Sequence, residues 1–100
     1  MFYNVLKAAK LASSEEKFFK KTLLENGNSS LNIISLDKDE IIDTHTSPED
    51  SAVYVLDGEI EIHFDAEKFT IEKGEILMFK KEHEHKVLAK KDSKFFVIKI

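Results

Sequence analysis

The chain has 100 residues, of which 42% are hydrophobic and 34% are charged, with a net charge of −4 and no cysteine. This length suits one domain of about 100–150 residues, and the composition is that of a folded globular protein, so two-domain, fibrous and disordered organisations are excluded. Without cysteine there are no disulfides, thiolate nucleophiles or cysteine-ligated metals, so any metal ion must be bound by His, Asp or Glu.

The first dozen residues carry apolar side chains at helical spacing. The i, i+3, i+4, i+7 pattern, which forms one stripe along an α-helix, falls on Phe2, Val5, Leu6 and Ala9. We therefore predict a short N-terminal helical segment over residues 1–14. It precedes a β-barrel over residues 17–100, and the two form a single domain over residues 1–100.

From Lys17 onward the apolar period changes to two, which is typical of strands. The pattern contains about nine short strands, with turn signals about every 8–12 residues. Asn26-Gly27-Asn28 predicts one hairpin, and Asp57-Gly58 is the strongest hairpin signal because Gly readily takes a positive φ. The only proline, Pro48, places its segment in a loop. These features predict an all-β sandwich or barrel.

The segment from His45 to Gly58, which contains Ser47 and Ser51, resembles the first conserved motif of the cupins, which are small jelly-roll barrels that hold ligands inside. That motif contains two histidines, a glutamate and a closing glycine. Here His45 stands at the first histidine and Gly58 at the closing glycine, while Ser47 and Ser51 stand at the second histidine and the glutamate.

A later segment resembles the second cupin motif, with Gly74 at its first glycine and His85 at its histidine. The resemblance covers about residues 17–100. It implies an all-β fold, a double-stranded β-helix or jelly-roll cupin barrel with a short N-terminal helix, of the small single-domain bacterial type with a degenerate metal motif.

The resemblance also implies a candidate metal site, because metal-dependent cupins hold a divalent ion on the motif histidines and glutamate. His45 and His85 keep two of those ligands, whereas the hydroxyls of Ser47 and Ser51 are poor ligands for Mn, Fe, Ni or Zn. His83 lies two residues before His85 and would reach the same side of an extended segment. A divalent metal on His45 and His85, with His83, Glu49 or Asp50 as a candidate third ligand, is therefore one hypothesis, and no cofactor is certain.

Two functions from different classes follow from the resemblance. The first is binding of a small organic molecule in a barrel pocket, formed by His45, Ser47, Ser51, Val53, Val55, Met78, His85 and Val87. The alternative is a weak divalent-metal-dependent enzyme of the isomerase, dioxygenase or decarboxylase kind. A histidine pair that is only a hydrogen-bonded structural feature stays open as well. The sequence leaves undecided whether the protein is an enzyme.

The sequence also carries expectations about partners and location. The chain has no arginine, and so lacks the planar fork that reads phosphates and guanine edges; we expect no nucleic-acid partner. No apolar stretch approaches the roughly 20 residues of a membrane helix, and the N-terminus does not open a signal peptide, so we expect no membrane association and a cytoplasmic location. Because a small domain leaves much surface exposed, we expect a homodimer.

Overall fold

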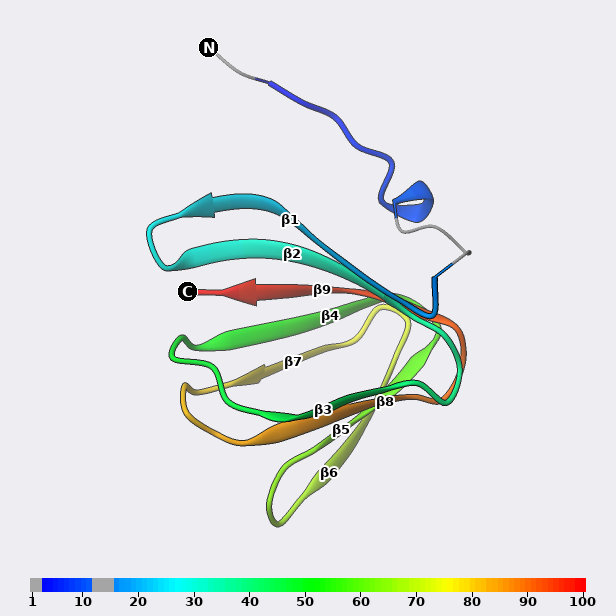
Figure 1. Ribbon diagram of the computed structural model, residues 1–100, viewed down its shortest axis with the longest axis vertical. Coiled ribbons are helices and arrows are strands. Elements are labelled where there is room, and N and C mark those ends of the chain that lie inside the picture. Colours follow the sequence, from blue (N-terminus) through cyan, green and yellow to red (C-terminus); the bar gives the residue numbers. More distant parts are fainter. Residues whose placement is uncertain (1–2, 12–15) are drawn as a thin grey trace.

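The structure, a computed structural model, describes residues 3–11 and 16–100. In this part of the chain nine strands form two facing antiparallel sheets, which confirms the predicted all-β fold (Figure 1). The strands are β1 (Phe18–Asn26), β2 (Ser29–Leu36), β3 (Ile41–His45), β4 (Ser51–Asp57), β5 (Glu59–His63), β6 (Lys68–Glu72), β7 (Ile76–Phe79), β8 (His85–Ala89) and β9 (Ser93–Lys99). One sheet has the order β1-β2-β9-β4-β7 and the other β3-β8-β5-β6.

The predicted N-terminal helix is reduced to a single 3-10 turn, η1 (Ala8–Lys10). The longer α-helix predicted over residues 1–14 is wrong for the described residues 3–11, and the remainder of that prediction lies outside the described residues. An isolated helix of this length is marginal in water without a packing partner, and Val5 of the expected stripe is 93% exposed. No helix in the described part has the length and apolar composition to span a membrane.

The two glycine turns singled out in the sequence have different roles. Gly27, with φ +61°, lies in the predicted hairpin between β1 and β2. The hairpin predicted at Asp57-Gly58 is wrong, because β4 and β5 belong to different sheets and the chain crosses between them there. Gly58 has φ +88°, and a Cβ on it would lie 2.3 Å from Ser93 Oγ. Glycine is needed at this crossing for both its positive φ and its close packing.

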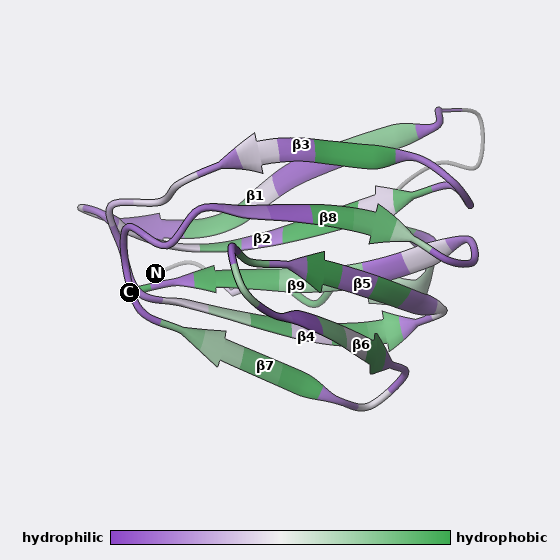
Figure 2. Cartoon of the chain, turned by 90° about the horizontal axis from the view of Figure 1, so that it is seen from below, coloured by the Kyte–Doolittle hydropathy of each residue, from purple (hydrophilic) through white to green (hydrophobic). Residues whose placement is uncertain are grey.

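The core lies between the sheets, where alternate side chains of each strand point inward. Figure 2 shows the apolar segments that the strands of both sheets contribute. The buried cluster consists of Ile34, Leu36, Val53, Val55, Ile60, Ile62, Ile71, Val87, Ala89 and Phe95. The predicted alternation of side chains therefore gives each sheet an apolar inner face, and these two faces pack against each other.

Candidate functional site

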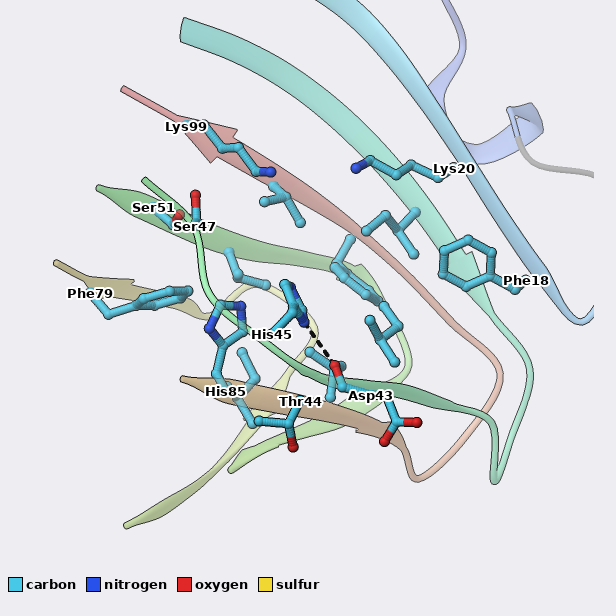
Figure 3. A pocket seen from close by; sticks show the side chains of 17 residues that line it. Phe18, Lys20, Asp43, Thr44, His45, Ser47, Ser51, Phe79, His85 and Lys99 are labelled. Atoms are coloured by element: carbon cyan, nitrogen blue, oxygen red, sulfur yellow. Dashed lines mark hydrogen bonds between the residues drawn. The ribbon is translucent and has the colours of Figure 1, made fainter. Parts of the chain in front are cut away.

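A cavity of about 380 Å³ opens between the two sheets (Figure 3). Its apolar walls come from both sheets and include Ile34, Ile42, Val53, Ile62, Val87, Phe95 and Val97. Along β4, Ser51 and Val53 border the cavity, whereas Val55 is fully buried in the core beyond it. The cavity thus occupies the end of the barrel where β4 begins, and packed side chains fill the other end.

Most of the pocket residues expected from the sequence line this cavity, namely His45, Ser47, Ser51, Val53, His85 and Val87. Two do not. Val55 lies too deep, and Met78 is 70% exposed on the outer side of β7. Because side chains alternate along a strand, the neighbour Phe79 points inward instead and lines the cavity.

The two motif histidines meet at this cavity. β3 and β8 pair antiparallel, and His45 stands directly opposite His85 in their register. The centroids of the two imidazole rings are 4.2 Å apart, with the ring planes inclined by 57°. His85 is 6% exposed, whereas His45 is exposed at the mouth of the cavity.

The backbone fixes the orientation of both rings in the same way. His45 Nδ1 lies 2.8 Å from the carbonyl oxygen of Asp43, and His85 Nδ1 lies 2.9 Å from that of His83. A carbonyl oxygen only accepts hydrogen bonds, so each Nδ1 carries the proton and donates. In the neutral rings Nε2 is therefore an acceptor, available to a hydrogen-bond donor in the cavity.

The buried ring is held in its neutral form. Burial is the main cause that lowers the pKa of His85, and electrostatic interactions with His45 and Lys99 lower it further. The hydrogen bond to the carbonyl of His83 acts in the opposite direction. His85 therefore presents a neutral imidazole at pH 7.

The motif serines are both buried, Ser47 at 4% and Ser51 at 6% exposed. Ser47 Oγ accepts a 3.3 Å hydrogen bond from the Glu49 amide, and Ser51 Oγ donates a 3.5 Å hydrogen bond to the Glu49 carbonyl. The hydroxyl proton of Ser47 is thus available to an acceptor in the cavity. These serines supply neutral hydrogen-bonding groups at the cavity.

The side chains at the cavity do not fit a resident divalent metal. Structural metal sites need about four protein ligands and catalytic sites about three, and no group of three or more His, Asp or Glu suited to a metal occurs in the described residues. His83 gives its carbonyl to His85, while it lines a separate cavity of about 370 Å³ together with Phe64, Phe69 and Phe79. The structure thus brings His45 and His85 together and places His83, a candidate third ligand, at the separate cavity.

Two lysines that the sequence patterns did not single out also line the cavity. Lys20 comes from β1 and Lys99 from β9, both on the inward side of the five-stranded sheet. The alternation of side chains along each strand indicates that both lysines point inward. Lys20 shares a strand face with Phe18, and Lys99 shares one with Val97 and Phe95.

Comparisons with known proteins agree on the architecture. A cupin superfamily protein from Desulfitobacterium hafniense matches with a TM-score of 0.86 and 20% identity, over 93% of this chain and 85% of that chain. A cupin 2 conserved barrel domain protein from Leptotrichia buccalis matches with a TM-score of 0.85 and 32% identity, over 94% of this chain and 46% of that chain. A conserved protein of unknown function from Streptococcus pyogenes matches with a TM-score of 0.79 and 25% identity, over 99% and 95%.

No curated protein sequence matches the chain. The family model described as the cupin domain matches residues 32–99, which include both motif histidines, most of β2 and all strands from β3 to β9. The predicted jelly-roll barrel is thus confirmed, and the chain belongs to the cupin domain family.

Proposed function

We propose that this cupin binds a small organic molecule in its barrel cavity, through the paired histidines and without a resident metal ion. The observation that carries the proposal is the pair His45 and His85, whose rings meet beside a cavity of about 380 Å³. This volume is within the range of about 300–1,000 Å³ that is usual for small-molecule pockets.

The chemistry of the cavity supports an organic ligand. Apolar walls bury the body of such a molecule, while a few fixed polar groups set its orientation. Two Nε2 acceptors and the hydroxyl of Ser47 provide those groups here, because both Nδ1 atoms are already bonded to backbone carbonyls. A ligand that carries a hydroxyl or amide donor beside an apolar body satisfies this arrangement.

The metal-dependent alternative has less support. Imidazole suits Fe, Ni and Zn, but two imidazoles and two hydroxyls leave the coordination shell of such an ion incomplete. Glu49 stands between the two serines in sequence, yet its recorded contacts with them are made by its backbone. The donor set thus favours hydrogen bonding of an organic molecule.

A thermal-shift screen with a library of small organic molecules tests the proposal. A ligand that binds only the folded protein raises its apparent stability by RT ln(1 + [L]/Kd). We expect hits on the wild type that are lost in Val97→Phe, in which a larger ring fills part of the cavity from its half-buried wall on β9. Circular dichroism checks that this variant folds.

Two outcomes overturn the proposal. One is that no compound stabilises the wild type more than Val97→Phe. The other is that protein purified without chelator retains one Mn, Fe, Ni or Zn ion per chain with submicromolar affinity, which makes the metal-dependent enzyme the better conclusion.

A further inference from the structure

The mouth of the cavity carries two lysine side chains that enter from opposite sides. Figure 3 shows Lys20 and Lys99 reaching over the cavity with their amino groups facing each other, on the side away from His85. They come from β1 and β9, which are separated by β2 in the sheet. Only long side chains on the inward face bring these two charges together.

This pair of cations lacks a compensating acid. No ion pair involves either lysine in the described residues, where the ion-paired lysines are Lys68, Lys80 and Lys90. Asp43 is the one acidic residue among the described residues that line the cavity, and in Figure 3 its carboxylate points away from the two amino groups. The mouth is therefore locally cationic although the chain carries a net charge of −4.

Burial and neighbouring positive charge both lower pKa values at the mouth. Burial lowers the pKa of Lys20, and the charge of Lys99 lowers it further. The charge of Lys99 also acts on His85, across the cavity. An arrangement that places like charges together without a partner is unfavourable in the free protein, and a bound anion relieves it.

We propose that the ligand of this cavity is an organic carboxylate, with its acid group held between Lys20 and Lys99 and its apolar body against the walls below. The inference rests on the proposed function, because it names the class of molecule that the same cavity binds. In the register of the five-stranded sheet Lys99 stands opposite Ser51, and Ser51 stands opposite Phe79. The acid group thus lies at the polar rim, beside an aromatic wall.

The apolar walls separate an organic acid from a free inorganic anion. Ammonium groups bind carboxylate and phosphate alike as point charges. Phe18, Ile34 and Val97 lie next to the lysines along the inward faces of their strands and line the same cavity. An inorganic ion gains no binding free energy from this apolar surface. The body of an organic acid buries the surface and gains free energy from it.

Titration calorimetry with octanoate and benzoate, their uncharged amides octanamide and benzamide, and inorganic phosphate tests the inference. The variants are Lys20→Met, Lys99→Met and the double variant. Lys21→Met is the matched control, since Lys21 is exposed on the opposite face of β1. We expect a carboxylate to bind the wild type and Lys21→Met alike, about tenfold more tightly than it binds the double variant.

The outcomes separate the two proposals. If the amides bind as tightly as the carboxylates and the double variant loses no affinity, the anion inference is wrong while binding in the cavity stands. If phosphate binds as tightly as the organic acids, the role of the apolar walls is refuted. If neither these probes nor a compound library stabilises the wild type more than Val97→Phe, the proposed function itself fails. The melting temperature of each variant without ligand shows that a loss of affinity is not a loss of folding.

Discussion

The rings of His45 and His85 face each other at 4.2 Å, each with its Nδ1 bonded to the carbonyl oxygen of the residue two positions earlier. The repeated bond follows from the pairing of β3 with β8, which sets the two residues opposite each other. In the neutral form of each ring it sets the same tautomer and leaves Nε2 as an acceptor.

Acid sensitivity of folding is the first prediction. Burial lowers the pKa of His85 below that of an unfolded histidine, about 6.5, so the unfolded chain binds more protons below that pH. The contribution of His85 to stability is complete above pH of about 6.5 and is lost as pH falls toward its folded pKa, with a slope of at most about 1.4 kcal/mol per pH unit. Urea unfolding across this range measures the slope. It should shrink in His85→Gln and persist in Ser47→Ala, and an unchanged slope in His85→Gln contradicts the prediction.

Removal of a mouth lysine should stabilise the free protein. Lys20→Met relieves repulsion with Lys99 and the cost of partial burial, but solvent screens this position, so the gain should be at most about 1 kcal/mol. Lys21→Met, on the outer face, tests the effect of adding an apolar side chain alone. Chemical denaturation compares the three proteins without ligand. A stability of Lys20→Met below that of Lys21→Met would count against the repulsion.

Adding an imidazole and a carboxylate beside the two histidines should create a metal site. Ser47 and Ser51 line the cavity beside the two histidines, so Ser47→His together with Ser51→Glu supplies an imidazole and a carboxylate to complete four ligands. We expect uptake of Mn, Ni or Zn by the double variant, with a rise in melting temperature on adding the ion. Elemental analysis after dialysis measures the stoichiometry, with the wild type and Ser47→Ala as controls. Equal uptake by the wild type contradicts the prediction.

Phe79 should act as the partition between two cavities. It lines both the histidine cavity and the neighbouring one, and its ring lies 4.7 Å from that of His85 and 5.2 Å from that of Phe64 between centroids. Phe79→Ala should join the two spaces, admit bulkier ligands and destabilise this half-buried position by about 2–3 kcal/mol. Melting temperatures with a series of ligands of increasing size measure both effects. Identical size limits in Phe79→Ala and Phe79→Leu would show that the ring is no partition.

The homodimer expected from the sequence stays a prediction. In each of the adjacent pairs Phe18-Phe19 and Phe95-Phe96, the first member points inward. Phe18 lines the cavity, and Phe95 is 1% exposed in the core. Phe19 and Phe96 lie half-buried on the outer face of the five-stranded sheet. We expect light scattering to give the mass of a dimer for the wild type and a lower mass for Phe19→Glu. A monomeric wild type at micromolar concentration contradicts the prediction.

The fold class follows from the sequence, because the period of two from Lys17 onward and the spaced turns are consistent with an all-β protein. The sequence also selected His45 and His85, whose positions relative to Gly58 and Gly74 carry the family resemblance. It overestimated the N-terminal helix, since a local apolar stripe forms a stable helix only when tertiary packing covers it.

The tertiary structure decided what local patterns leave open. Asp57-Gly58 has the signature of a hairpin, yet the chain crosses there between sheets, because a turn signal fixes a local bend and not the partner of the next strand. Val55 lies below the cavity because the closed barrel buries that part of β4. Met78 points outward because side chains alternate along β7. Lys20 and Lys99 are 79 positions apart in the chain, and only the arrangement of β1, β2 and β9 brings their charges to one cavity mouth.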